Sequence, residues 1–411
     1  MRILFITGRF PYPLLRGDQL RAFHQLRILG QRHRVTVASF AARPPSPEER
    51  DAVAAHCERI FIVPLGPAAM GRNLARHALH GLPLQAALYD DPAMTRALRA
   101  LGADGEYDVV HVQLSRMALH LSSCPARARV VDLVDALSLG MERRAAREHP
   151  PLRWAASLES RRLRAHERRV VAEADEAVVT SAADRDALGA PPNLTVVPNG
   201  VDTARFPFGR GPREPGRVVF TGNLGYFANA DAVVWFADRV LPLLRRSLPA
   251  VRFEVVGARP PRALRRLARA GAFTLVGPVA DVGERLRFAQ AAVAPLQAGS
   301  GQSNKTLEAL ASGTPAVVSP LAAAGLEARH DEHLLVAGSA QDFAAAVARV
   351  LEDKALAERL AVAGRALVES AYTWERSVER LESAYARALE KAAGRDGKEK
   401  GRPETPGAPG S

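Results

Sequence analysis

Short apolar runs of strand length alternate with amphipathic segments along most of the chain. The first run is Arg2–Thr7, and from Asp18, a suitable N-cap, apolar residues recur at helical spacing. Further runs follow at residues 35–40, 60–65, 109–113, 129–135 and 177–181, and a second series occupies 217–221, 252–257, 273–277 and 292–296. Strands that alternate with helices predict a doubly wound parallel sheet, so the two series predict two such sheets.

The length and the breaks in this pattern predict two domains. A chain of 411 residues is too long for one ordinary hydrophobic core and suits two domains of about 150 to 200 residues. We expect a first domain over residues 1–200, a proline- and glycine-rich linker over 201–216, a second domain over 217–370, a terminal helix over 371–391 and a disordered tail over 392–411. The predicted fold class is therefore α/β.

Composition adds a strong positive charge. The chain has 56 Lys and Arg against 44 Asp and Glu, a net charge of +12. Such a balance suits nucleic acid, an anionic membrane surface or phosphorylated substrates, but nucleic acid is not expected, because no strand interleaves aromatic and basic residues. Cys57 and Cys124 fit neither a disulfide framework nor a zinc site. Because no transmembrane run or signal peptide is visible, we expect a cytoplasmic protein.

The segment 292–319 carries the strongest functional signal. It reads as a strand ending at Leu296, a glycine and serine loop at Gly299–Ser303, a helix from Asn304 and a further strand. A helix that begins where a glycine-rich turn follows the carboxyl end of a strand offers free N–H groups and a positive dipole to a phosphate. The segment therefore predicts a site for a nucleotide.

Two charged residues of this helix fit such a ligand. Lys305 could neutralise phosphate charge, and the carboxylate of Glu308, set among apolar neighbours, could bind ribose hydroxyls. The alternative is an ordinary helix start with an intrahelical pair of Lys305 and Glu308. Spacing alone leaves both interpretations open.

The first half offers weaker candidates. The loop after the first strand lacks the GxGxxG pattern, which argues against a nicotinamide or flavin dinucleotide. His111 and Asp135 lie towards the carboxyl ends of the predicted strands 109–113 and 129–135, which should meet at one edge of the sheet, so either could contact a substrate and Asp135 could act as a base. His111 could equally be a structural histidine, and Asp135 a helix N-cap.

An arginine-rich segment surrounds Trp154. Nine arginines and four glutamates lie between Glu142 and Arg169, and a solvated helix with ion pairs is the default interpretation. A tryptophan among arginines also suits a membrane interface, where a lipid-linked acceptor would lie.

The segment from the glycine-rich loop through Leu307-Glu308-Ala309-Leu310-Ala311 to Gly313-Thr314-Pro315-Ala316-Val317-Val318 resembles the nucleotide-sugar signature of family-4 retaining glycosyltransferases with the GT-B fold. Residues 302–308 resemble a bacterial branch found with exopolysaccharide and PEP-CTERM export systems. The resemblance spans roughly residues 1–390. It implies two Rossmann-like domains that face a deep cleft, and a C-terminal helix that crosses back to the first domain.

The resemblance also assigns roles to residues. The loop at Gly17, with Asp18 and Arg21 on the acceptor side, would lie over the cleft. Many relatives hold the diphosphate with an arginine and a lysine where this chain has Asn223 and Ala228, so Lys305 is the expected substitute, and Ser300 replaces a glutamate eight residues before Glu308. The expected nucleotide-sugar site comprises Gly17, Gly222, Asn223, Gly277, Ser300, Gly301, Gln302, Ser303, Asn304, Lys305 and Glu308, and the expected catalytic residues are Lys305, Asp135 and His111.

The implied reaction transfers a sugar from a nucleotide diphosphate sugar to a hydroxyl of a glycan or lipid-linked acceptor, with retention of configuration. No DxD motif, His cluster or Cys pair suggests a metal site, so no metal and no cofactor besides the donor is expected. A lipid-linked acceptor would place the protein peripherally on the anionic inner face of the cytoplasmic membrane. A sugar-nucleotide epimerase of the same fold and a non-catalytic protein that binds nucleotide sugars or anionic glycans are the alternatives.

Overall fold

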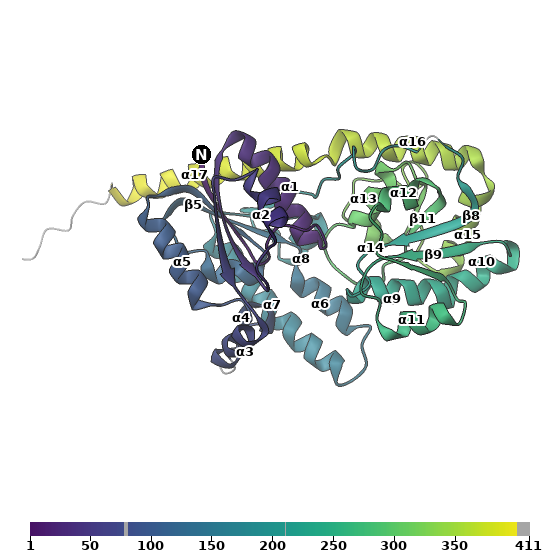
Figure 1. Ribbon diagram of the computed structural model, residues 1–411, viewed down its shortest axis with the longest axis horizontal. Coiled ribbons are helices and arrows are strands. Elements are labelled where there is room, and N and C mark those ends of the chain that lie inside the picture. Colours follow the sequence, from purple (N-terminus) through teal and green to yellow (C-terminus); the bar gives the residue numbers. More distant parts are fainter. Residues whose placement is uncertain (78–80, 210, 401–411) are drawn as a thin grey trace, which may run out of the picture.

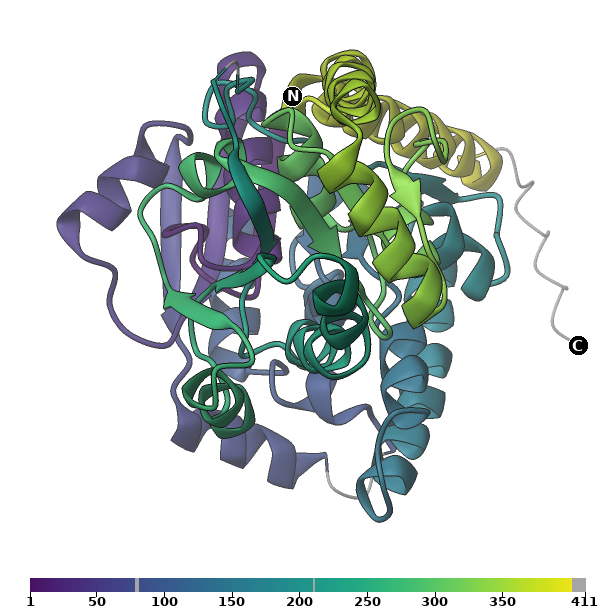
Figure 2. The same ribbon diagram turned by 90° about the vertical axis from the view of Figure 1, so that its right-hand side faces the viewer.

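The computed structural model describes residues 1–77, 81–209 and 211–400, with side chains through residue 395 (Figures 1 and 2). Two parallel sheets form the centres of two domains, in the strand orders β3-β2-β1-β4-β5-β6-β7 and β10-β9-β8-β11-β12-β13. The prediction of two doubly wound parallel sheets is therefore confirmed. In each sheet the order reverses beside the first strand, and in such folds ligands bind outside the carboxyl ends of the strands at that point.

The first sheet consists of β1 (Arg2–Thr7), β2 (Arg34–Ala41), β3 (Arg59–Pro64), β4 (Tyr107–Gln113), β5 (Ala126–Val134), β6 (Glu176–Val179) and β7 (Leu194–Val196). Its helices are α1 (Gly17–Arg32), α2 (Pro47–Ala54), α3 (Pro67–Arg76), α4 (Leu84–Ala87), α5 (Pro92–Ala103), the 3₁₀ helix η1 (Ser115–His120), α6 (Leu137–Ala145), α7 (Leu152–Glu173) and α8 (Ala182–Ala187). The central strands are almost wholly buried, because helices cover both faces of the sheet.

The second sheet consists of β8 (Glu214–Thr221), β9 (Arg252–Val256), β10 (Thr274–Gly277), β11 (Ala289–Ala294), β12 (Ala316–Val318) and β13 (Leu335–Val336). Its helices are α9 (Phe227–Trp235), the π-helical turn η2 (Phe236–Val240), α10 (Leu241–Ser247), α11 (Arg262–Arg269), α12 (Val282–Arg287), α13 (Asn304–Ala311), α14 (Pro320–Ala323), α15 (Ala340–Glu352) and α16 (Lys354–Ala371). Strand β8 begins inside the segment expected to be linker, because the Glu214 amide already donates to Phe288 O at 2.9 Å.

The last helix, α17 (Trp374–Lys400), crosses from the second domain and lies along the first (Figure 1). Trp374 and Tyr385 are fully buried in the core of the first domain, and the Trp374 ring stacks on His24 with the centroids 4.8 Å apart. At Gly200 a Cβ would come within 2.4 Å of the Trp374 amide nitrogen. The close approach explains why glycine stands where the chain leaves the first domain.

The disordered tail was predicted to begin at residue 392, but the structure is helical beyond that point. Helix α17 continues through residues 392–400, which were expected to be disordered, and residues 401–411 lie outside the described part of the chain. Ala392 is buried, Lys391 Nζ lies 2.7 Å from Glu176 Oε2, and Arg395 pairs with Asp175. These partners at the start of β6 stabilise a stretch that has no apolar pattern of its own. Within the described ranges, no helix is both long and apolar enough to cross a bilayer.

Replacement of Trp374 tests the role of the crossing helix. We expect Trp374→Ala to lower the free energy of unfolding by about 3–5 kcal/mol, because it leaves a large cavity between α17 and α1. Val362→Ala on the exposed face of α16 is the control and should change the free energy of unfolding by less than about 0.5 kcal/mol. Urea denaturation followed by circular dichroism measures both, and equal midpoints for the two variants would contradict this role for Trp374.

Candidate active site

The carboxyl ends of β8 and β11 bring Gly222 and Lys305 together. Lys305 is in the first turn of α13, and its Nζ donates to Asn229 Oδ1 at 2.9 Å. The side chain passes close to Gly222, where a Cβ would lie 3.3 Å from Lys305 Cε, and over the ring of Phe220 at 5.4 Å. Among the residues that the structure describes, this ammonium donates to one side chain, the neutral amide of Asn229, so its charge is available to an anion.

Burial shifts Lys305 and Glu308 towards their neutral forms. Desolvation lowers the pKa of Lys305 to about 8, although the carboxylate of Glu308 opposes this shift. Desolvation likewise raises the pKa of Glu308 to about 7, against the opposing effects of Lys305 and Arg205. Groups that titrate near neutrality in a partly buried position are typical of ligand sites.

The glycine-rich loop is held by the first domain. The amide of Gly301 donates to both carboxylate oxygens of Asp184, at 3.2 and 3.0 Å, and the amide of Gln302 donates to Thr180 Oγ1 at 3.2 Å. These N–H groups were predicted to face a phosphate, and in this structure they do not. The sequence could not show this, because Asp184 lies 117 residues before Gly301.

Further contacts fasten both ends of the loop. Arg143 Nη1, on α6, donates to the carbonyl of Gly299 at 2.7 Å. Ser300 packs on α6, where a Cβ at Gly140 would lie 2.7 Å from its hydroxyl oxygen. The predicted sugar-contacting residue Ser300 therefore faces the first domain.

The start of α13 lacks a side-chain cap. Ser303 is the N-cap, and its side chain accepts no bond from the helix backbone. In the first turn the amide of Thr306 donates to Ser303 O at 3.0 Å, whereas the amides of Asn304 and Lys305 have no acceptor within the helix, by the geometry of a helix. The part of the predicted phosphate site that the structure retains is therefore this turn, and not the loop before it.

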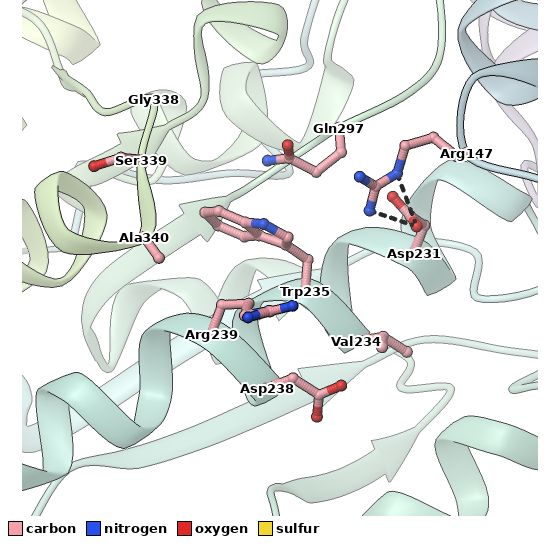
Figure 3. Close-up of a pocket in the computed structure, with 10 residues that line it drawn as sticks. All are labelled: Arg147, Asp231, Val234, Trp235, Asp238, Arg239, Gln297, Gly338, Ser339 and Ala340. Carbon is pink, nitrogen blue, oxygen red and sulfur yellow. Dashed lines mark hydrogen bonds and ion pairs between the residues drawn. The ribbon is translucent and has the colours of Figure 1, made fainter.

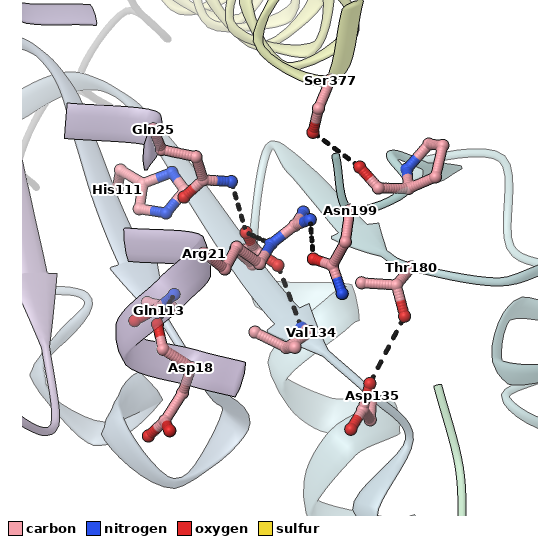
Figure 4. Close-up of polar contacts among 12 residues, drawn as sticks. Asp18, Arg21, Gln25, His111, Gln113, Val134, Asp135, Thr180, Asn199 and Ser377 are labelled. Carbon is pink, nitrogen blue, oxygen red and sulfur yellow. Dashed lines mark hydrogen bonds and ion pairs between the residues drawn. The ribbon is translucent and has the colours of Figure 1, made fainter. Parts of the chain in front are cut away.

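Arg21 was expected on the acceptor side, and the structure corrects this. Its side chain is fully buried, with Nε donating to Asp132 Oδ2 at 2.6 Å and Nη1 to Asn199 Oδ1 at 2.9 Å (Figure 4). Asn199 in turn donates through Nδ2 to Asn304 Oδ1 at 3.0 Å, and its amide donates to Gln302 Oε1 at 2.6 Å. Arg21 thus supports the contact between the domains.

The loop at Gly17 does lie near the second domain. A Cβ at Gly17 would be 3.6 Å from Asn304 Nδ2. Asp18 forms an ion pair with Arg9, and its backbone carbonyl accepts from Gln113 Nε2 at 3.0 Å. These contacts fix the loop at the carboxyl edge of the first sheet.

His111 is not at the predicted site. It is fully buried in β4, stacks on Phe5 with ring centroids 4.3 Å apart, and its Nδ1 is hydrogen-bonded to Tyr385 Oη at 2.9 Å. Burial lowers its pKa to about 4, so the ring is neutral. His111 therefore joins the sheet to α17 and does not reach the space between the domains.

Asp135 does lie where the domains meet. Its Oδ1 accepts from Thr180 Oγ1 at 3.3 Å, and a Cβ at Gly301 would come within 1.8 Å of the same oxygen (Figure 4). Burial and the neighbouring Asp184 raise the pKa of Asp135 well above the usual range. A raised pKa favours the protonated form of this carboxyl group, which argues against a role as general base.

The remaining predicted residues border Lys305 and the second sheet. Asn223 Oδ1 accepts from the Gly225 amide at 3.0 Å, and the Asn223 carbonyl accepts from Asn229 Nδ2 at 2.8 Å. Gly277 has φ 81° at the end of β10, and its carbonyl accepts from the Gly257 amide at 2.9 Å. Sequence reasoning missed Asn229, whose only signal is its place in the first turn of α9.

A cavity of about 480 Å³ lies elsewhere, beside α9 (Figure 3). Its lining includes Trp235 and Gln297, and at one side Arg147 of the first domain pairs with Asp231 at 3.0 Å. None of the predicted site residues lines it. The cavity therefore does not mark the nucleotide site that the sequence predicts.

The contact between Gly301 and Asp135 gives a test of the held loop. We expect Gly301→Ala to destabilise the protein by about 2–3 kcal/mol, because the methyl group would overlap the carboxylate and the residue has φ 75°. Asp135→Ala in the same chain should recover part of this loss, with a coupling of about 0.5–3 kcal/mol in a double-mutant cycle. Additive effects would show that the two residues do not meet in solution.

Comparison with known proteins agrees with the geometry. Residues 21–205 match the family model described as Glycosyltransferase Family 4, and residues 215–353 match Glycosyl transferases group 1. Glycogen synthase of Mycobacterium tuberculosis is 29% identical over 403 residues, which cover 91% of this chain and 92% of that protein. These matches cover both domains of the chain.

Two solved structures share the arrangement of both domains. Sucrose-phosphate synthase from Thermosynechococcus elongatus gives a TM-score of 0.71 at 17% identity and covers 95% of this chain and 100% of its own. Anabaena HepE in complex with UDP-glucose gives a TM-score of 0.64 at 14% identity, and the match covers 94% of this chain and 99% of the HepE chain. These likenesses show the GT-B fold, which the sequence predicted. With a glycosyltransferase domain in each half of that fold, the chain belongs to the glycosyltransferases.

Proposed function

We propose that this glycosyltransferase moves a sugar from a nucleotide diphosphate sugar to a hydroxyl of a glycan or lipid-linked acceptor, with retention of configuration. The observation that carries the proposal is the position of Lys305, in the first turn of α13 and beside Gly222, with Glu308 one turn further along. A cation, free helix N–H groups and a carboxylate in that order match a diphosphate followed by a ribose.

Lys305 and the first turn of α13 would bind the diphosphate of the donor. The partner of the ammonium is the neutral amide of Asn229, which itself donates to the carbonyl of Asn223, so Lys305 supplies the positive charge at this point of the site. Glu308 would accept from the ribose hydroxyls, and Gly277 would border the base. A uridine nucleotide is the first donor to test, because the similar HepE structure contains UDP-glucose.

The protein would act mainly by orienting the substrates. In a front-face reaction the bond from the anomeric carbon to the phosphate oxygen breaks, the acceptor oxygen bonds to the same face, and the leaving diphosphate takes the acceptor proton. This route needs no protein base and fits the site, because His111 is buried within the sheet and burial raises the pKa of Asp135. Lys305 and the helix dipole would stabilise the developing phosphate charge without a metal.

The donor must reach a loop that the first domain now holds. Asp184 occupies the amide of Gly301, as an anionic ligand would. We infer that the domains part at this contact for donor entry and product release, as is common for sites between two domains. A role in exopolysaccharide assembly is supported by the sequence of residues 302–308.

The experiment that tests the function begins with the donor. Thermal-shift measurements with uridine, guanosine and adenosine diphosphate sugars should identify one that raises the melting temperature. The product formed with an acceptor is then examined by NMR, where retention predicts the anomeric configuration of the donor. An isomerised sugar from donor alone would identify an epimerase, and binding with neither hydrolysis nor transfer would identify a non-catalytic protein.

Substitution of Lys305 tests its role directly. We expect Lys305→Met, which keeps the length of the side chain beside Phe220, to weaken binding of the nucleotide diphosphate about tenfold or more. Arg266→Met on the exposed face of α11 also removes one positive charge, and its affinity for the nucleotide diphosphate should stay within about twofold of that of the parent. Calorimetry measures both, and equal affinities for Lys305→Met and the parent would exclude the assignment.

The pH dependence of binding follows from the same residue. An anion binds the protonated ammonium, so affinity should be greatest below pH 8 and should fall as the pH rises through about 8, the pKa of Lys305. Lys305→Met should lose this step in calorimetry between pH 7 and pH 9. If the variant shows the same fall in affinity near pH 8, a group other than Lys305 causes it.

A further inference from the structure

An apolar tip extends from the lower edge of the first domain. Of the nine large apolar side chains that are exposed in the described residues, four lie on α4 and the first two turns of α7. They are Leu84, Leu152, Trp154 and Leu158, with exposed fractions of 49%, 57%, 68% and 50%. We call these four residues the apolar tip. Isolated exposed apolar residues are ordinary, but a group that includes a largely exposed tryptophan marks an interaction surface.

Hydrogen bonds hold α4 and α7 together at this tip. Glu159, buried on α7, accepts from the amides of Leu84 and Gln85 at 3.0 and 3.1 Å. In both views α3, α4 and the start of α7 lie at the lower edge of the first domain (Figures 1 and 2). The apolar side chains therefore project from a structured part of the domain and not from a free loop.

Positive charge adjoins the apolar tip. Trp154, Leu158 and Arg161 are spaced by four and three residues, so they share one face of α7. Arg153 and Arg161 are exposed, and none of the ion pairs formed by the described residues includes either of them. The one carboxylate of these first turns, Glu159, is buried and bound to amides. The surface thus combines apolar insertion with uncompensated cations.

We propose that this tip docks the protein on a bilayer surface rich in anionic phospholipid headgroups. Leucine and tryptophan side chains enter the interfacial region, and arginines beside them meet the headgroups. A second protein copy would bury the apolar side chains equally well, but it would leave the arginines without partners. The proposal goes beyond the proposed sugar transfer, and it does not depend on it.

The position of the tip connects the membrane to the site. Helix α6 packs on α7, and Arg143 of α6 donates to the carbonyl of Gly299 in the glycine-rich loop. A membrane bound at α7 would therefore lie on the side of the molecule from which α6 reaches this loop. An acceptor anchored in the bilayer would approach the space between the domains from that side.

Vesicle binding tests the proposal with the full-length chain. We expect the protein to sediment with vesicles of phosphatidylglycerol and phosphatidylcholine, and to do so much less with phosphatidylcholine alone or at high salt. The triple variant Leu152→Gln, Trp154→Gln and Leu158→Gln should bind at least about a hundredfold more weakly, since each buried apolar side chain contributes about tenfold. Val362→Gln on α16 is the matched control and should bind as the parent does.

Two further readouts keep the result unambiguous. Vesicles should shift the tryptophan emission of the parent to shorter wavelength, and Trp154→Phe should abolish the shift while Trp235 and Trp374 remain. Nucleotide binding by the triple variant should equal that of the parent, since the changed residues are exposed. Absence of binding by the parent, or equal binding by the triple variant, would overturn the proposal, as would light scattering in which the same changes convert a dimer to a monomer.

Discussion

The buried guanidinium of Arg21 fixes the place where the two domains meet. It binds Asp132 at the end of β5 and Asn199 at the exit from the first domain, and Asn199 binds Asn304 at the start of α13. Hydrogen bonds must offset the loss of solvent around a buried ion pair, and Gln25 Nε2 supplies one more to Asp132 at 3.1 Å, while Arg21 Nη2 has no partner among the described residues. Through Arg21 and Asn199, this ion pair is joined to the first sheet, the exit segment and helix α13, so one chain of contacts spans both domains.

The electrostatics of the second domain depend on that placement. Lys305 and Glu308 lie on α13, whose first turn the first domain holds through Asn199, and burial brings both groups towards neutrality. Under the proposed function, such a site would stabilise an anionic donor, because charges interact more strongly in a partly buried position than in water. In this structure the carboxylate of Asp184 accepts from the Gly301 amide, which would also suit an anionic donor.

Local patterns predicted the sheets and the start of α13, and long-range contacts explain where prediction failed. The run Arg2–Thr7 and the glycine-rich loop before Asn304 carry their structure in adjacent residues. Arginine is normally exposed, and nothing near Arg21 in the sequence indicates a partner 111 residues away. The extension of α17 to residue 400 depends in the same way on acidic residues at the start of β6.

The course of α17 makes the first domain discontinuous in the chain. Its hydrophobic core includes Trp374, Tyr385 and Ala388, which the ribosome delivers only after the whole second domain has been made. Until α17 has been made, the apolar surface that it covers in the folded protein, mainly along β5 and β6, lacks this cover. During synthesis the second domain can therefore be completed before the first, although the first domain comes earlier in the sequence.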